Sequence, residues 1–197
     1  SELRMKTNLV TAILLAGGKS RRFGGNKLVA VLPDSDAPIC VRVATVIAPF
    51  VSKMLIMVEE PKNDTSAVLN SYGFSVTHSE NAIKGMAHTL SDGVQAAPLG
   101  TDFLIVLSDM PFVTETIVNK ILCLMASTNK ITVPLFCGEM GHPVGFPAIY
   151  REELTNLKGD TGAKEIIQRH SSNVAFIEIN NDGVVKDIDT RADLEPR

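Results

Sequence analysis

Short, unbroken apolar runs recur along this chain, and polar residues separate them. The most continuous runs cover residues 9–15, 54–58 and 103–107, and two further candidates cover residues 130–134 and 174–177. Runs of this length without alternation are typical of strands that are covered on both faces. The pattern therefore predicts strands in these segments and a sheet with both faces buried.

Apolar residues between these runs follow helical spacing. They recur at intervals of about four positions across residues 86–94 and 117–125, with Thr114 placed as the N-cap of the second segment. A third helix is expected over residues 161–170. Strands that alternate with helices predict an α/β fold, with a mostly parallel, doubly wound sheet and helices on both faces.

The chain divides into a short N-terminal extension, residues 1–8, and one domain, residues 9–197. A chain of 197 residues can bury one substantial core. No internal repeat, low-complexity segment or change in composition divides it further, and the polar segment 33–38 is expected to be a turn.

Composition restricts the class of protein. A net charge of −3 argues against a general nucleic-acid binder, which needs a basic face. No apolar run is long enough to span a membrane, and residues 1–6 lack the apolar segment of a signal peptide. The three cysteines show no CxxC spacing. Cys40, Cys123 and Cys137 have apolar neighbours and are expected to be buried thiols of a cytoplasmic protein.

The loop after the first apolar run combines glycine with positive charge. Residues 14–27 contain four glycines and four Lys or Arg side chains. Glycine lets backbone N–H groups approach a ligand, and the cations supply charge-assisted donors for phosphate. The spacing matches neither a P-loop nor the dinucleotide fingerprint. The loop therefore predicts a polyphosphate site of another kind.

Carboxylates follow two of the later strand segments. Asp109 lies just after the 103–107 run, where it could hold Mg²⁺ or cap the turn before Pro111. Asp187 and Asp189 would lie on one face of an extended segment, so a second carboxylate for the same ion is one hypothesis. The competing hypothesis is an Asp N-cap for a helix that begins near Arg191.

His142 lies between glycine and proline, which indicates a loop. It is expected either to face a ligand or to be an ordinary loop histidine. A loop of glycines and cations opposite one or two carboxylates is suited to metal-assisted transfer at a phosphate. A phosphate monoester, with a second pKa of about 6, would already be an anionic nucleophile at neutral pH, so no general base is required.

The order of these motifs resembles a known family. Leu15-Ala16-Gly17-Gly18-x-Ser20-x-Arg22-x-Gly24-x-x-Lys27 resembles the signature loop of the sugar-nucleotidyltransferase-like superfamily, in its molybdenum-cofactor branch. Later matches are Gly85-Met86-Ala87-x-x-Leu90-x-x-Gly93, Asp109-Met110-Pro111, Gly141-His142-Pro143-Val144, Gly159-Asp160-x-Gly162-Ala163 and Asp187-Ile188-Asp189-Thr190. The resemblance covers residues 9–195, and the later motifs resemble the molybdopterin cytidylyltransferases more than the guanylyltransferases.

The resemblance implies a Rossmann-like nucleotidyltransferase that uses Mg²⁺. CMP would pass from CTP to the phosphate of molybdopterin, with release of pyrophosphate, in the maturation of the molybdenum cofactor. CTP and molybdopterin would be the small-molecule partners, and a molybdoenzyme could receive the product. GTP is the competing nucleotide, because Gly24-Gly25 resembles the guanylyltransferase loop. Two further hypotheses are a non-catalytic cofactor carrier and a sugar-1-phosphate nucleotidyltransferase.

The resemblance also assigns residues to roles. The catalytic residues would be Arg22, Lys27 and Asp109, the metal ligands Asp109 and Asp189, and the acceptor-binding residue His142. The nucleotide-binding residues would be Leu15, Ala16, Gly17, Gly18, Lys19, Ser20, Arg22, Lys27, Gly85 and Leu90.

Overall fold

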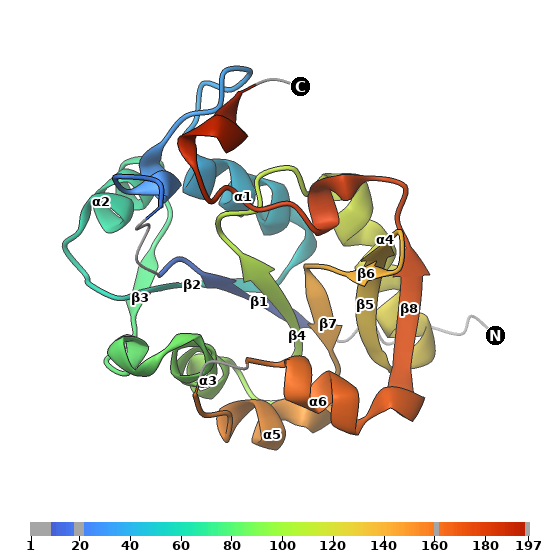
Figure 1. Cartoon of the computed structure of the whole chain (residues 1–197). Coiled ribbons are helices and arrows are strands. Elements are labelled where there is room, and N and C mark those ends of the chain that lie inside the picture. The colour runs from blue at the N-terminus through green and yellow to red at the C-terminus, as the bar shows by residue number, and fades with distance from the viewer. Residues whose placement is uncertain (1–8, 18–21, 160–161, 196–197) are drawn as a thin grey trace.

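One sheet runs through the middle of the molecule, with helices packed against both of its faces (Figure 1). This computed structural model describes residues 9–17, 22–159 and 162–195. The expected α/β fold is confirmed. Within the described residues, no helix is both long and apolar enough to cross a membrane.

The sheet combines a parallel half with a mixed half. Its strands are β1 (Val10–Leu15), β2 (Lys53–Val58), β3 (Val76–His78), β4 (Asp102–Leu107), β5 (Ile131–Phe136), β6 (Glu139–Met140), β7 (Val144–Phe146) and β8 (Val174–Glu178). The order is β3-β2-β1-β4-β7-β5-β6, and β8 pairs with β5. β1 to β4 are mutually parallel, whereas β7 is antiparallel to both β4 and β5.

The helices form a layer on each side of the sheet (Figure 1). They are α1 (Ile39–Ile47), α2 (Asp64–Ser71), α3 (Met86–Ala96), α4 (Glu115–Thr128), α5 (Arg151–Thr155) and α6 (Lys164–Arg169). α1, α2 and α4 lie on one side, and α3, α5 and α6 on the other.

Alternate residues of the central strand face the two layers. Ala12 and Leu14 of β1 pack in the core with α1 and α4, while Ile13 and Leu15 pack with α3. The side chains of Ala12, Ile13 and Leu14 are fully buried. A strand that is buried on both faces cannot alternate between apolar and polar residues, which is why its sequence reads as a continuous run.

The sheet topology brings two loops together. β1 lies between β2 and β4, and Leu15 pairs in register with Leu107 at the carboxyl ends of β1 and β4. The chain order reverses between these two strands, and ligands of doubly wound sheets bind beside such a point. The glycine-rich loop and Asp109 therefore leave the sheet side by side.

Some sequence expectations need correction. Cys40 is buried as expected, but Cys123 and Cys137 are exposed. Cys123 lies on the outer side of α4, whose buried side carries Ile121 and Met125. Cys137 lies in the turn between β5 and β6. Within the described residues, the third expected helix begins at Lys164 rather than near residue 161.

Candidate active site

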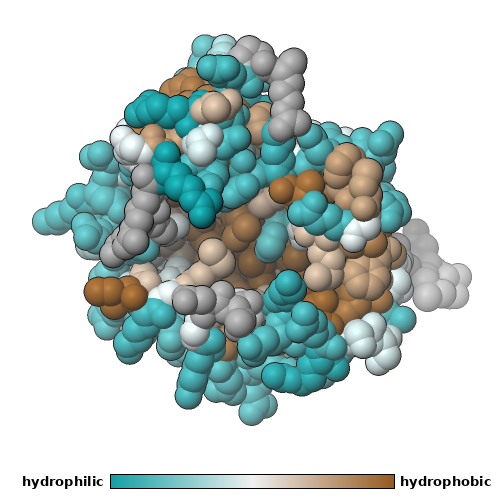
Figure 2. All heavy atoms as spheres, in the orientation of Figure 1, coloured by the Kyte–Doolittle hydropathy of each residue, from teal (hydrophilic) through white to brown (hydrophobic). Residues whose placement is uncertain are grey.

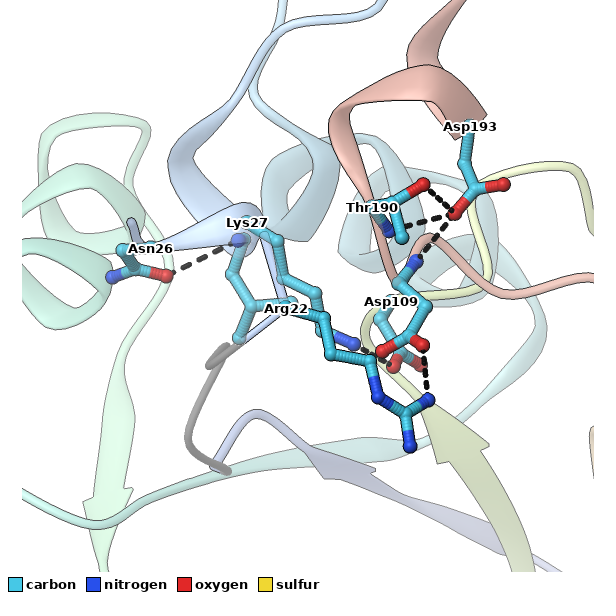
Figure 3. A network of polar contacts seen from close by, with 8 residues as sticks. Arg22, Asn26, Lys27, Asp109, Thr190 and Asp193 are labelled. Carbon is cyan, nitrogen blue, oxygen red and sulfur yellow. Dashed lines mark hydrogen bonds and ion pairs between the residues drawn. The ribbon is translucent and has the colours of Figure 1, made fainter. Parts of the chain in front are cut away.

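An ion pair joins the glycine-rich loop to the end of β4. Lys27 Nζ lies 2.8 Å from Asp109 Oδ2, and the two side chains are only 16% and 22% exposed. Lys27 begins a short 3₁₀ turn, Lys27–Val29, and the Leu28 N–H of this turn donates to Asn26 Oδ1. Figure 3 shows Lys27 and Arg22 converging on the same carboxylate-bearing region. Lys27 and Asp109 are therefore in contact, although they are distant in sequence, and both are expected to be catalytic.

The C-terminal segment lies against this pair. The backbone N–H of Ile188 donates to the carbonyl of Asp109 at 2.9 Å. This hydrogen bond holds the segment of Asp187 and Asp189 beside Asp109. Arg22 Nη1 lies 2.6 Å from Asp189 Oδ2. The Arg191 guanidinium stacks over the ring of Phe23 at 4.8 Å, and Phe23 itself is buried. These contacts hold the end of the glycine-rich loop against the acidic motif.

Asp187 also belongs to this acidic region. Partial burial of its carboxyl group is the largest cause that raises its pKa, and the negative charge of Asp109 adds to the shift. Lys27 opposes the shift, which places all three charged groups within electrostatic reach of one another. Hydrogen bonding to Asp189 is the largest cause that raises the pKa of the exposed Arg22.

The helix-cap hypothesis for the acidic motif is only partly right. A short 3₁₀ helix does begin at Arg191, but its N-cap is Thr190. The Asp193 carboxylate accepts from the Thr190 backbone N–H at 2.7 Å and from the Asp189 N–H at 3.0 Å (Figure 3). The side chains of Asp187 and Asp189 are therefore not needed to cap this helix.

An apolar cavity of about 290 Å³ opens beside the carboxylates. Figure 2 shows the hollowed centre of this face, with apolar residues on its floor and hydrophilic residues around it. β1, β4, β5 and β7 supply the floor through Leu15, Ile105, Leu107, Val133 and Val144, and α3 supplies Met86 and Leu90. The cavity is suited to the uncharged body of a ligand.

His142 lines this apolar cavity. Burial lowers its pKa to about 4, although the Asp109 carboxylate acts in the opposite direction, so the ring is neutral near pH 7. Its backbone N–H donates to the carbonyl of Val184 at 2.8 Å. Gly141 permits this contact, because an added Cβ would lie 2.0 Å from the same carbonyl oxygen. The histidine can donate or accept one hydrogen bond at the cavity without adding charge.

A second pocket, polar and about 220 Å³ in volume, opens on the other side of the glycine-rich loop. Its lining residues are Ala16, Gly17, Gly25, Asn26, Leu28, Glu59, Asn63 and Thr65. Asn26 Nδ2 donates to Thr65 Oγ1 at 2.8 Å, which ties the loop to the start of α2. The sequence does not single out Glu59, because no neighbouring motif marks it and its place beside the loop depends on the pairing of β2 with β1.

The expected nucleotide-binding residues divide between the two pockets. Ala16 and Gly17 line the polar pocket, whereas Leu15 and Leu90 line the apolar cavity together with His142. Gly85, with a φ of 120°, precedes α3 as its N-cap. Gly18, Lys19 and Ser20 lie outside the described residues.

Ser108 adds an unusual feature next to Asp109. Its side chain is 1% exposed, and among the described residues its Oγ is the only buried side-chain oxygen or nitrogen without a hydrogen-bond partner. In most native structures a buried hydroxyl of this kind is hydrogen-bonded to protein atoms or to water.

Known proteins resemble this chain over nearly its whole length. The purine catabolism protein PucB of Bacillus subtilis is 26% identical over 196 residues, which cover 94% of each chain. The structure of Rv0371c from Mycobacterium tuberculosis is 22% identical, covers 94% of this chain and 95% of that one, and superposes with a TM-score of 0.81. A manganese complex of Rv0371c is 19% identical, covers 87% and 88%, and has a TM-score of 0.71.

At these identities, the structural matches establish the fold alone. The family model of the MobA-like NTP transferase domain matches residues 12–174, which include the glycine-rich loop, Lys27, Asp109 and His142. The chain therefore belongs to the MobA-like NTP transferase family of nucleotidyltransferases.

Proposed function

We propose that this protein transfers CMP from CTP to the phosphate of molybdopterin and releases pyrophosphate. The observation that carries the proposal is the Lys27–Asp109 pair at the carboxyl ends of the central strands. Lys27 follows Asn26 of the polar pocket, and Asp109 follows Leu107 of the apolar cavity by two positions. Charge suited to a polyphosphate thus lies next to two pockets of different chemistry.

The proposed reaction is a displacement at the α-phosphorus of the nucleotide. An oxygen of the acceptor phosphate forms the new P–O bond, and the bond between the α-phosphorus and the bridging oxygen to the β-phosphorus breaks. The electron pair leaves with pyrophosphate. Lys27 and Arg22 stabilise the negative charge that develops on the leaving group. Since the acceptor is already an anion, the neutral His142 is not required as a base.

The carboxylates of this region would supply part of the coordination of a divalent ion. Asp109, Asp187 and Asp189 offer the hard oxygen ligands that Mg²⁺ prefers, and Asp187 and Asp189 lie two positions apart in the segment that contacts Asp109. Within the described part of the chain, no cluster of three or more acidic, His or Cys side chains could enclose a metal by itself. That suits an ion that also binds substrate phosphates. When bound, Mg²⁺ would neutralise phosphate charge.

We place the body of the acceptor in the apolar cavity, next to His142. The cavity is lined mainly by apolar side chains, and Lys164 and His142 supply polar groups at its boundary. This leaves the polar pocket for the nucleotide, so Leu15 and Leu90, which the resemblance assigns to the nucleotide, would contact the acceptor instead. A carrier that binds the finished cofactor without using a nucleoside triphosphate would not need Lys27 beside Asp109. The proposal also includes a cytoplasmic location for this protein and a molybdoenzyme that receives the product.

A screen for pyrophosphate release tests this proposal. Purified protein is incubated with Mg²⁺ and molybdopterin, and with CTP, GTP, ATP or UTP in turn. We expect the highest kcat/KM with CTP, and a loss of about a hundred-fold or more in Asp109→Asn. Glu178→Gln removes an exposed carboxylate at the end of β8 and serves as the matched control. Preference for GTP would replace CTP as the substrate, and full activity in Asp109→Asn would reject the assigned site.

A further inference from the structure

Arg191 lies against the end of the glycine-rich loop. Its guanidinium is 4.8 Å from the centre of the Phe23 ring, and a Cβ added at Gly25 would lie 3.5 Å from Arg191 Nη2. The side chain is exposed to solvent, and within the described part of the chain its guanidinium has no hydrogen bond or ion pair. The contact with the aromatic face of Phe23 is therefore its main interaction.

Phe23 anchors the loop in the core. Its side chain is only 3% exposed and belongs to the same core cluster as Leu28, whereas its neighbours Arg22 and Gly24 are exposed. Gly24, with a φ of 73°, turns the chain directly after this anchor. Because Lys27 follows Phe23 by four residues, the position of Phe23 restricts where Lys27 can lie.

Hydrogen bonds fix the segment that carries Arg191. The Asp193 carboxylate accepts from the N–H of Thr190 and forms a capping box with it. The N–H of Ile188 donates to the carbonyl of Asp109 at 2.9 Å. The backbone of Arg191 therefore has a defined position relative to Asp109.

These contacts form a closed ring around the candidate site. The ring runs from Asp109 to Lys27 through their ion pair, along the loop to Phe23, and across to Arg191. It returns to Asp109 along the C-terminal segment, through the hydrogen bond of Ile188. Removal of Arg191 would open this ring without removing a group that the proposed reaction uses.

A second link between the same two segments does involve reacting groups. Arg22 pairs with Asp189 at 2.6 Å (Figure 3), but in the proposed reaction Arg22 binds phosphate and Asp189 binds a metal ion. This pair is therefore expected to separate when the substrates bind. The contact between Arg191 and Phe23 can persist throughout the reaction.

On this basis, which rests on the proposed nucleotidyltransferase function, we propose that Arg191 is a positioning residue for nucleotide binding. It acts through Phe23, holds the end of the glycine-rich loop in its binding position, and does not itself contact the nucleotide. Without this contact, the loop is in its binding position for a smaller fraction of the time, and the apparent affinity falls by that fraction. A bound nucleotide then holds the loop itself, so the rate at saturation changes little.

Calorimetric titration with CTP and with GTP, in the presence of Mg²⁺, tests this role. We expect Arg191→Ala to weaken binding of the preferred nucleotide by about three- to ten-fold, the range of a cation–π contact. Lys186→Ala is the matched control, because Lys186 Nζ also lies 4.8 Å from the centre of an aromatic ring, but that ring belongs to Phe112, outside the glycine-rich loop. It should change the affinity by less than about two-fold.

A double-mutant cycle separates positioning from direct contact with the nucleotide. Phe23→Leu keeps an apolar side chain in the core but removes the aromatic face, so the further replacement Arg191→Ala should have almost no effect on affinity. Arg191→Lys keeps a cation near the ring and should restore part of the affinity. In steady-state kinetics, Arg191→Ala should raise KM for the nucleotide and leave kcat at saturation and the thermal melting temperature nearly unchanged.

The outcomes distinguish this role from the proposed function. Wild-type affinity in Arg191→Ala would overturn the positioning role and leave nucleotidyl transfer intact. An equal loss of affinity from Arg191→Ala in the wild-type and Phe23→Leu backgrounds would overturn it as well, because Arg191 would then act independently of Phe23. If the wild type binds no nucleoside triphosphate, both proposals are overturned.

Discussion

At the scale of single residues, Lys27 connects the phosphate-binding loop to the acidic end of the sheet. Its ammonium group is largely shielded from solvent and lies 2.8 Å from the Asp109 carboxylate. A charge held in a shielded position stabilises developing phosphate charge more strongly than a solvated one. The Arg22 side chain, by contrast, is 77% exposed, so solvent screens its ion pair with Asp189 more strongly.

Replacement of Lys27 should therefore impair the reaction far more than replacement of a remote lysine. We expect Lys27→Ala to lower kcat/KM for pyrophosphate release by about a hundred-fold or more. Lys53→Ala, at the amino end of β2, is the control and should be indistinguishable from wild type. Equal rates for the two variants would remove Lys27 from the reaction.

His142 should make the stability of the protein depend on pH. Its pKa in the folded state is about 4, below the ordinary value of 6.5, so the unfolded state binds more protons between these values. The neutral ring therefore allows full stability of the folded state above pH 6.5, and stability is lost as the pH falls towards 4. Urea unfolding measures the free energy of unfolding at pH 7 and at pH 5. The decrease between these two pH values should be about 1–2 kcal/mol smaller in His142→Gln than in wild type. Parallel curves for the two proteins would show that the ring is not buried as described.

Sequence identifies some of these residues and not others. Lys27 and Asp109 follow from glycine, cation and carboxylate motifs after apolar strands, and these chemical signals are local. Glu59 also follows an apolar run, but its place beside the glycine-rich loop depends on the pairing of β2 with β1. The sequence pattern pairs Asp187 only with Asp189, and its coupling to Asp109 becomes visible through the contact between the two segments.

At the scale of elements, close backbone contacts join the segments that carry the site. A Cβ at Gly141 would lie 2.0 Å from the carbonyl oxygen of Val184, and a Cβ at Gly183 would lie 2.4 Å from that of Phe112. The loop of His142, the turn after Asp109 and the segment before Asp187 are therefore packed backbone to backbone. Glycine is required where these segments meet.

Substitution at this junction should disturb the whole site. We expect Gly141→Ala to lower the free energy of unfolding by about 3 kcal/mol, because backbone rather than a flexible side chain must move. Gly25→Ala is the control, since its Cβ would lie no closer than 3.5 Å to a neighbouring atom, and it should cost less than about 1 kcal/mol. Chemical unfolding measures both, and a Gly141→Ala protein as stable as wild type would disprove the tight contact.

The capping of α4 offers a second test at this scale. The sequence predicts Thr114 as its N-cap, and the Thr114 hydroxyl oxygen accepts from the Ile117 N–H. Thr114→Ala should lower the free energy of unfolding by about 1 kcal/mol. Thr114→Ser keeps the acceptor and should restore most of that loss. Urea unfolding compares the two, and identical losses in both variants would show that the hydroxyl does not act as the cap.

Helices and strands differ in how well their sequences predict them. α4 has a clear apolar stripe and an N-cap, so its first residue is confirmed, while it ends three residues beyond the predicted stripe. The sequence pattern does not reveal α1, because seven of its nine residues are apolar and so short an apolar segment can also be read as a buried strand. β3, β6 and β7 have only two or three residues each, which is too few to show a period. β3 and β7 also pair with strands that are distant in sequence, β2 and β4.

At the scale of the whole molecule, the sheet separates two pockets of different chemistry around one charged centre. The parallel half supplies the glycine-rich loop and Asp109, and the mixed half supplies the loop of His142. The sequence pattern predicts β1, β2 and β4 of the parallel half from their continuous apolar runs, and the strand–helix alternation that it detects indicates parallel pairing. The antiparallel β7 between β4 and β5 breaks that alternation, and only the structure shows how it closes the apolar cavity.

The central claim is that a nucleotidyl group, rather than a terminal phosphate, moves to the acceptor. Its most direct test is the reaction of molybdopterin with CTP that carries radioactive phosphorus at either the α or the γ position. We expect the α label to appear in the acceptor product and the γ label in pyrophosphate, in equal amounts. A γ label in the acceptor or in free inorganic phosphate, with no α label transferred, would contradict it.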